Sequence, residues 1–220
     1  MAVSGTVPQP LNRGRAFRYE SFATDAELGL LTCRYSLDGR EFAERVTLKP
    51  GPRWRTEAAR AAARLVFLLA GVSYYKTAAP PVIDLGPTEL TEPELAFLRE
   101  FYLQGLGEFA YRNALDLTPL RIEAVLTPGR RHPQTPPRTG ELPAPPYPPG
   151  ALVPFGGGID SIVVVERVRR LADAALFVVS RPADRFDAIE APAAVTGLPV
   201  VRAAREIGRA SCRERVCYVV

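Results

Sequence analysis

The sequence has few of the residues that build metal sites and disulfides. Its 220 residues include one histidine, one tryptophan and three cysteines. Cys33, Cys212 and Cys217 make neither an even disulfide framework nor a CxxC ligand pair, which argues against a structural zinc site and suits a reducing compartment. His132 lies in a proline-rich stretch, where we expect a solvated side chain and no catalytic base.

Long uninterrupted runs of apolar residues or of basic residues are also missing. Residues 1–14 have no apolar core of signal-peptide length, and the apolar run at 65–71 is far shorter than a membrane span. The 28 basic and 24 acidic residues give a net charge of +4, and the basic residues are scattered along the chain. We therefore expect a cytoplasmic protein with no membrane or nucleic-acid partner. With 47% apolar residues the chain can bury a core, as one large domain or two modest ones.

The N-terminal part begins as an antiparallel sheet. From Arg15 apolar residues alternate with polar ones, and Asp38-Gly39 is a strong hairpin signal because both central residues of a type I′ turn need positive φ. The alternating residues are Phe17, Tyr19, Leu31, Cys33, Tyr35, Leu37, Phe42, Val46 and Leu48. We expect Glu41, Glu44 and Arg45 to form a solvated face of this sheet and not a catalytic carboxylate pair.

Helical periods follow. An apolar stripe over 56–70, ending at Gly71, predicts a core helix, and the Thr91-Glu-Pro-Glu94 capping box predicts a second one that loosens at two glycines, 105 and 107. Residues 122–126 have the pattern of a short strand.

Two segments have an unusual density of polar groups. The stretch 72–80, which we expect to be a loop or short strand, carries Ser73, Tyr74, Tyr75 and Lys76; the two tyrosines are either ligand-binding groups or the two faces of a strand. Residues 108–113 carry a second set, which is either a functional cluster or the polar surface of a helix. Its members are Glu108, Tyr111, Arg112 and Asn113.

The composition changes after residue 127. Nine prolines between residues 128 and 150 predict a semi-rigid linker. Apolar strands at 152–155, 175–179 and 198–201 then alternate with helices over about 160–172 and 185–195. This alternation indicates a parallel, doubly wound α/β sheet, in which ligands bind at the carboxyl ends of the strands.

A glycine-rich loop, Gly156-Gly-Gly-Ile-Asp-Ser161, lies directly after the first of these strands. Glycine lets backbone N–H groups approach an anion closely, and a helix N-terminus adds unpaired donors, so we expect a phosphate site; the alternative is a tight turn with no ligand. Asp160-Ser161 replaces the Lys-Ser/Thr pair of a Walker loop, and Ser161 stands where a dinucleotide fingerprint needs its third glycine.

The loop resembles the PP-loop of ATP pyrophosphatases, Ser-Gly-Gly-x-Asp-Ser, and departs from it at Gly156. The resemblance implies an adenine nucleotide α-hydrolase-like fold, with ATP and Mg²⁺ as cofactors and leaving pyrophosphate held by the loop. It implies Asp160 and Ser161 as catalytic residues. The implied ATP-binding set is Phe155, Gly156, Gly157, Gly158, Asp160, Ser161, Val179 and Ser180.

Four segments together, 35–42, 70–76, 105–113 and 153–158, make the chain similar to the bacterial UDP-N-acetylmuramoyl-L-alanyl-L-glutamate epimerases of peptidoglycan synthesis. The resemblance covers about residues 15–201. It implies an isomerase that adenylates the terminal L-glutamate with ATP, inverts its α-carbon and releases D-glutamate product, AMP and pyrophosphate. The two polar clusters become candidates for binding the UDP-linked muramoyl dipeptide. Ile159 departs from the lysine of many relatives, and the lost cation would weaken triphosphate binding.

We therefore predict a disordered N-terminus (1–14), an α+β substrate domain (15–127), the linker (128–150), the start of a PP-loop domain (151–205) and a non-native tail (206–220). A sheet cut after three parallel strands would expose apolar faces, so we expect an unstable fragment. The alternatives are a PP-loop ligase, amidating or tRNA-thiolating, and an inactive nucleotide-binding fragment. The lack of a CxxC pair and of a basic run stands against the ligase.

Overall fold

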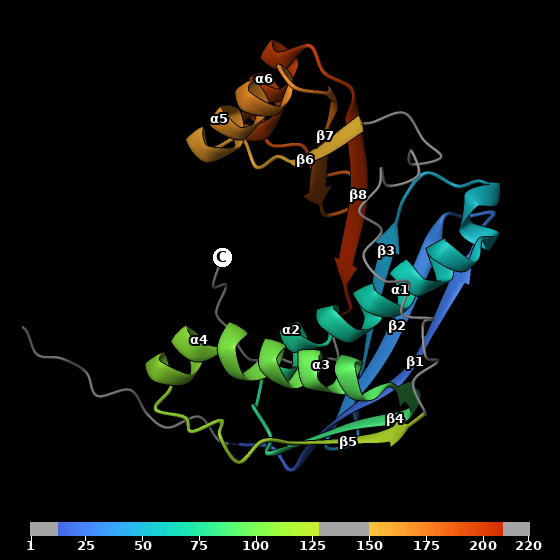
Figure 1. Cartoon of the computed structure of the whole chain (residues 1–220), viewed down its shortest axis with the longest axis vertical. Helices are drawn as coiled ribbons and strands as arrows, with labels where there is room; N and C mark the ends of the chain where they lie inside the picture. The colour runs from blue at the N-terminus through green and yellow to red at the C-terminus, as the bar shows by residue number, and fades with distance from the viewer. Residues whose placement is uncertain (1–12, 128–149, 209–220) are drawn as a thin grey trace, which may run out of the picture.

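The computed structural model describes residues 13–127 and 150–208, which form one eight-stranded sheet with helices packed on it (Figure 1). In chain order the elements are β1 (Ala16–Asp25), β2 (Leu30–Leu37), β3 (Arg40–Thr47), the 3-10 helix η1 (Pro52–Arg55), α1 (Glu57–Ala70), α2 (Val72–Tyr75), β4 (Val82–Leu90), α3 (Glu92–Gly105), α4 (Gly107–Arg112), β5 (Arg121–Leu126), β6 (Gly150–Pro154), α5 (Ile159–Val168), β7 (Asp173–Ser180), α6 (Asp187–Thr196) and β8 (Val200–Ile207). The strand order is β5-β4-β1-β2-β3-β8-β7-β6.

The predicted hairpin joins β2 to β3. Asp38 and Gly39 have φ values of 49° and 82°, as a type I′ turn requires. The Asp38 carboxylate also accepts hydrogen bonds from the backbone N–H groups of Arg15 and Ala16, which fixes the start of β1. Turn chemistry visible in the sequence therefore sets the register of the antiparallel strands.

The first core lies between this part of the sheet and α1, α2 and α3, and buried tyrosines run through it. The Tyr19 hydroxyl donates to the Leu68 carbonyl at 2.7 Å and accepts from the Tyr102 hydroxyl at 2.7 Å. Gly71 allows this approach, because a Cβ there would lie 2.6 Å from the Tyr19 hydroxyl oxygen. Burial raises the pKa of Tyr19 and Tyr102 well above the usual value for tyrosine, so both stay neutral hydrogen-bonding groups.

The segment after α1 corrects two predictions. Residues 72–75 form the short helix α2, where we expected a loop or short strand, and Tyr74 and Tyr75 both point into the core instead of straddling a strand. Four residues are too few to show a helical period in the sequence. β4 was not among the predicted strands, and its Gly86-Pro87 pair is a turn signal in a sequence.

The second core joins β6 and β7 to α5 and α6 and contains Val153, Phe155, Val165, Leu176 and Val178. The three strands β6, β7 and β8 are parallel neighbours, as their apolar runs predicted. They follow one another in chain order. The reversal of strand order that defines a doubly wound sheet does not occur within residues 150–208.

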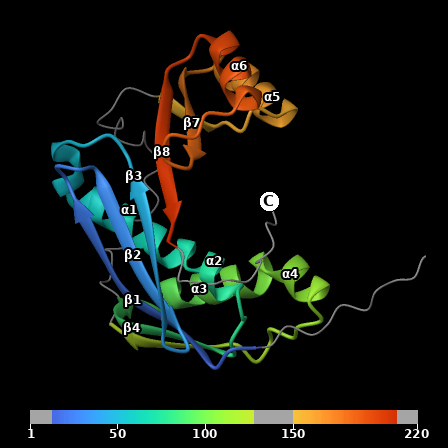
Figure 2. The same cartoon turned by 180° about the vertical axis from the view of Figure 1, so that it is seen from behind.

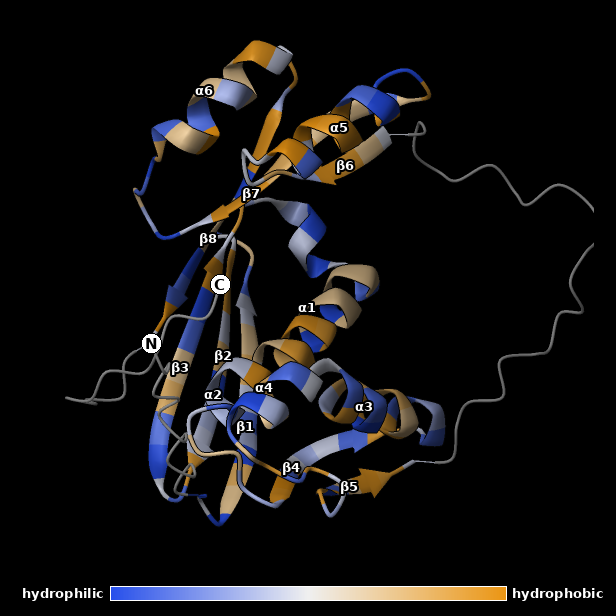
Figure 3. Cartoon of the chain, turned by 90° about the vertical axis from the view of Figure 1, so that its left-hand side faces the viewer, coloured by the Kyte–Doolittle hydropathy of each residue, from blue (hydrophilic) through white to orange (hydrophobic). Residues whose placement is uncertain are grey.

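β8 links the two cores. Its first half pairs in parallel with β7, and its second half pairs antiparallel with β3, from Glu44↔Ile207 to Thr47↔Ala204. Seen from behind, β8 runs from the α5–α6 unit down alongside β3 (Figure 2). Figure 3 shows α1 to α4 in front of β1 to β4 and, above them, α5 and α6 in front of β6 and β7. The sheet is therefore continuous across the boundary between the two predicted domains.

The predicted domain boundaries remain predictions. Arg13 and Gly14, which we assigned to the disordered N-terminus, hydrogen-bond to the carbonyls of Ala79 and Ala78. Glu206 and Ile207, which we assigned to the non-native tail, are part of β8. The predicted linker residues 128–149, with His132, lie outside the described residues, as do Cys212 and Cys217.

Candidate functional site

The glycine loop connects β6 to α5, where the sequence placed it. Phe155 is buried in the second core, and its backbone N–H donates to the Phe177 carbonyl at 2.8 Å. The next residues leave the sheet at the carboxyl end of β6. The loop is therefore anchored on a rigid strand, while Gly156 and Gly158 are exposed.

The three glycines have different roles. Gly157 has a φ of 77°, and a Cβ there would lie 2.1 Å from the Ala188 carbonyl oxygen in the first turn of α6. A Cβ at Gly156 or Gly158 would meet no atom within 4 Å. Gly157 is thus required by the fold itself, whereas the other two keep an open surface that a ligand can approach.

The start of α5 offers free donors. Its N-cap is Gly158, which has no side chain to cap the first-turn N–H groups. Asp160 lies exposed in that first turn, beside Ile159, which is 76% exposed. Ser161 closes the loop, because its Oγ accepts a hydrogen bond from the Gly156 N–H at 3.2 Å. Uncapped amides at a helix N-terminus suit an anion.

The other predicted nucleotide residues lie on the neighbouring strand. Val179 and Ser180 end β7, and Val179 is half exposed. The N-cap of α6, Phe186, also makes no side-chain cap, so two uncapped helix starts flank the glycine loop. No group of three or more His, Cys, Asp or Glu side chains in the described residues is arranged to hold a metal. Mg²⁺ needs no such cage, because one or two carboxylates with substrate phosphates suffice.

The first predicted substrate cluster is partly buried. The Ser73 Oγ accepts a hydrogen bond from Arg205 Nη2 at 3.1 Å. Tyr74 and Tyr75 belong to the core, and burial raises the pKa of both hydroxyls above the usual tyrosine value. Lys76 is half-buried and C-caps α2. Ser73, through its hydrogen bond to Arg205, and Tyr74, whose hydroxyl interacts with Glu44 and Arg205, both join a charged network.

That network contains two residues that the sequence reasoning missed. Glu44, which we placed on a solvated face, is 1% exposed and forms a two-pronged ion pair with Arg205, at 2.7 Å to Nε and 3.1 Å to Nη2. The prediction was wrong for Glu44 and correct for Glu41 and Arg45, which are exposed. Glu44 is two residues from Phe42 and two from Val46, so its side chain points to the same, core-facing side of β3. This alternation was the signal in the sequence that could have shown its burial.

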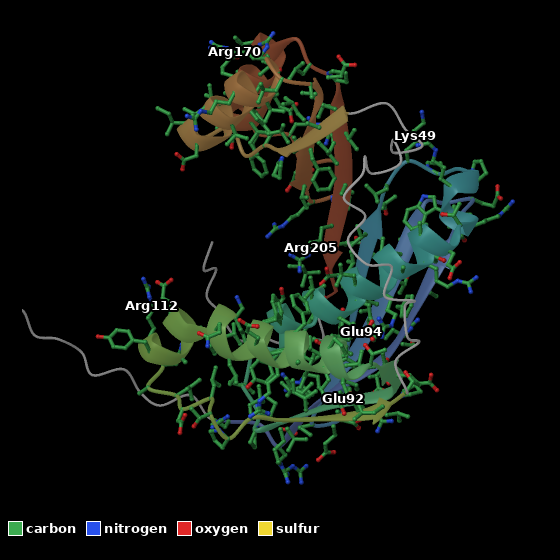
Figure 4. The ribbon with its side chains drawn as sticks, in the orientation of Figure 1. Lys49, Glu92, Glu94, Arg112, Arg170 and Arg205 are labelled. Carbon is green, nitrogen blue, oxygen red and sulfur yellow. The ribbon has the colours of Figure 1, made fainter. Side chains whose placement is uncertain are left out.

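The second predicted cluster has the arrangement of a solvated helix surface. In α4, Arg112 pairs with Glu108 one turn earlier at 2.7 Å, with both side chains largely exposed. Tyr111 is 87% exposed, and Asn113 Nδ2 donates to the Phe109 carbonyl at 2.8 Å. Figure 4 shows Arg112 at the outer end of α4, far from the labelled Arg205. The structure does not bring the two clusters together.

Among the helices of residues 13–127 and 150–208, none combines the length and the hydropathy that a membrane-spanning helix needs.

Comparison with known proteins identifies relatives of the chain. Residues 9–212 match the family model described as the MurL N-terminal domain.

Three curated proteins are similar, each named UDP-N-acetyl-alpha-D-muramoyl-L-alanyl-L-glutamate epimerase. The protein of Xanthomonas oryzae pv. oryzae is 38% identical over 160 residues, 70% of this chain and 33% of its own length. The proteins of Salinispora tropica and a Micromonospora species are 35% identical over 211 residues and 34% identical over 175 residues. These two matches span 90% and 74% of this chain, and 43% and 36% of the relatives. The chain thus spans between a third and somewhat under half of the length of these relatives. No solved structure matches the chain.

Proposed function

The chain belongs to the MurL N-terminal domain family, and from this premise we propose that it works in an ATP-dependent epimerase of peptidoglycan synthesis. The proposed reaction converts the terminal L-glutamate of UDP-MurNAc-L-Ala-L-Glu to D-glutamate, with Mg²⁺ as the metal. The names of the three relatives support the substrate. Because the chain spans only part of them, the activity belongs to the whole protein.

One observation supports the nucleotide part of the proposal most strongly. Gly156 and Gly158 leave open backbone beside the uncapped N-terminus of α5, at the carboxyl end of β6. A loop that served only as a turn would need the positive φ of Gly157 and no more. The two further glycines fit a cradle in which phosphate oxygens approach backbone N–H groups.

Each residue of the loop has a role in this proposal. ATP, when bound, would supply the adenylyl group that converts the glutamate α-carboxylate to an acyl adenylate, with release of pyrophosphate. The N–H groups of Gly158, Ile159 and Asp160 would hold the departing phosphates. The Asp160 carboxylate would hold Mg²⁺, because a carboxylate beside phosphates is stable only with a cation between them. Ser161 keeps the loop closed through Gly156.

The epimerase chemistry has a simple physical basis. A free α-carboxylate carries a negative charge, and removing the adjacent proton would place a second negative charge beside it. Adenylation of the carboxylate removes the first charge, so a protein base can take the α-proton and a proton can return on the opposite face. Water would then cleave the acyl adenylate, which restores the carboxylate and releases AMP. This order of events requires the nucleotide site to act before the proton transfer.

The test uses the protein at the full length that its gene encodes, incubated with ATP, Mg²⁺ and UDP-MurNAc-L-Ala-L-Glu. We expect pyrophosphate release that depends on this substrate. Asp160→Ala should abolish the release, whereas Asp173→Ala should leave it unchanged, because Asp173 is exposed at the opposite end of β7. Release that requires ammonia or tRNA would favour a PP-loop ligase. Absence of release with retained ATP binding would favour a nucleotide-binding fragment, and full activity of Asp160→Ala would remove the loop from the mechanism.

A further inference from the structure

Arg205 lies at the same edge of the sheet as the candidate nucleotide site. In the parallel register, Ser180 at the end of β7 pairs with Ala204 of β8, so Arg205 is the next residue beyond that level. The edge formed by the carboxyl ends of parallel strands is where α/β sheets bind ligands. Arg205 is about one strand spacing (~5 Å) from the end of β7. Pro154, which ends β6, pairs with Phe177 at the level of Val201, so Arg205 is two strands away from β6 and about 13 Å further along the strand direction.

The guanidinium of Arg205 is held in one orientation. Glu44 accepts from its Nε at 2.7 Å and from its Nη2 at 3.1 Å, and the Ser73 Oγ accepts from Nη2 at 3.1 Å. Glu44 comes from β3 and Ser73 from α2, so both partners belong to the first core. An arginine fixed in this way has lost its side-chain freedom before any ligand arrives.

One nitrogen of Arg205 remains available. Among the contacts of the described residues, Nη1 has no assigned partner, and 33% of the side chain is exposed. Figure 4 shows Arg205 between the end of β8 and α2, and Figure 1 shows β7 ending above the same helix layer. Arg202, three residues earlier, points to the other face of β8 and pairs with Glu190 of α6. The two arginines therefore form ion pairs on opposite faces of β8, and of the two Arg205 has the more exposed side chain.

We propose that Arg205 is an anion-binding residue of the epimerase, oriented by Glu44 and Ser73, whose free guanidinium nitrogen holds an oxyanion of the substrates at the sheet edge where β7 ends. This inference rests on the proposed function. The oxyanion is either a carboxylate of the muramoyl dipeptide or a phosphate of ATP, since arginine binds both through charge-assisted hydrogen bonds. ATP and the UDP-linked dipeptide are both long molecules, and bound together along this edge they would span the distance between the loop and Arg205.

The test variant removes the charge of Arg205 without leaving the Glu44 carboxylate buried and unpaired. Arg205→Met alone would strand the Glu44 carboxylate, so the variant is Glu44→Met with Arg205→Met, in which both charges are replaced by apolar groups of similar volume. The matched control is Glu190→Met with Arg202→Met, on the same strand but the other face. Thermal melting by circular dichroism checks the fold of both. Should Glu44→Met/Arg205→Met not fold, Glu44→Gln with Arg205→Gln replaces it, since this variant also removes both charges and keeps hydrogen-bonding groups at both positions.

Two measurements on the full-length protein identify the anion: the Kd for MgATP by calorimetry and the KM for UDP-MurNAc-L-Ala-L-Glu in pyrophosphate release. Loss of a hydrogen bond to a charged group predicts an increase of about 10- to 100-fold in one of them. An increased Kd indicates a nucleotide phosphate, and an increased KM alone indicates a dipeptide carboxylate. The control should change neither value more than about twofold.

Unchanged values in a folded Arg205 variant, with an active wild-type protein, would overturn the inference and leave the proposed function intact. Equal losses in the variant and its control would also overturn it, because they would show a structural effect of β8 alone. A wild-type protein that neither binds MgATP nor releases pyrophosphate would overturn both proposals.

Discussion

Replacing Gly157 with alanine tests the structural role assigned to the middle glycine of the loop. The residue has a φ of 77°, and its new Cβ would lie 2.1 Å from the carbonyl oxygen and 3.0 Å from the carbonyl carbon of Ala188. The left-handed conformation costs an L-residue about 1–2 kcal/mol. Forcing backbone atoms of α6 aside adds about 1–3 kcal/mol, as in overpacked cores. We expect Gly157→Ala to lower the free energy of unfolding by about 2–5 kcal/mol.

The assay is urea unfolding of the 220-residue chain, followed by far-UV circular dichroism, since Trp54 lies in η1, remote in sequence from the loop. Gly156→Ala is the matched control. Its Cβ meets nothing within 4 Å, so stability should change by less than about 1 kcal/mol, while MgATP binding should weaken because the methyl group occupies the surface that phosphates approach. Equal stability of the two variants would refute the argument that Gly157 is a structural residue of the loop.

Three further predictions concern the cores. Glu44→Ala should lower the free energy of unfolding by up to about 3 kcal/mol in urea titrations, because Arg205 loses its buried partner; no change would show that solvent compensates it. The Arg64 guanidinium holds the pKa of Glu94 below its usual value, so this carboxylate stabilises the fold above that usual value and loses the contribution as pH falls through the lowered pKa. Glu94→Gln should therefore lose less stability between neutral pH and acid than the wild type, and parallel pH profiles would contradict this. Tyr19→Phe removes a hydroxyl with two buried hydrogen bonds and should cost about 1–3 kcal/mol in thermal unfolding; a smaller cost would indicate that water replaces it.

The local features of the fold were predictable from the sequence. The Asp38-Gly39 turn, the Thr91 capping box and the apolar strands around the glycine loop each depend on residues close in the chain. In the structure, Thr91 Oγ accepts from the Glu94 N–H and the Glu94 carboxylate accepts from the Thr91 N–H, as the motif requires.

The features that were missed depend on contacts distant in the sequence. Glu44 looked like a solvated residue because its partner, Arg205, is 161 residues away. The pairing of β3 with β8 joins two segments that we had assigned to separate domains. Periodicity shows which face of a strand is apolar, but it does not show which strand lies beside it or whether a charge on the apolar face has a partner.

In the candidate site, too, the features that depend on neighbouring residues could be predicted and the others could not. The glycine loop could be located because glycine spacing and the following helix are local signals, and its exposed backbone agrees with a phosphate site. The polar clusters at 73–76 and 108–113 could not be evaluated from density of polar groups alone. The structure shows that Tyr74 and Tyr75 are core residues and that Glu108 and Arg112 are a surface pair.

We propose that the loop activates a glutamate carboxylate before its α-carbon inverts. The most direct test is the ratio of D-glutamate formed to pyrophosphate released. The full-length protein is incubated with UDP-MurNAc-L-Ala-L-Glu, ATP and Mg²⁺, and released pyrophosphate is compared with D-glutamate recovered from the hydrolysed product. We predict that D-glutamate forms only with ATP and never exceeds the pyrophosphate released. Formation of D-glutamate without ATP, or without pyrophosphate, would contradict it.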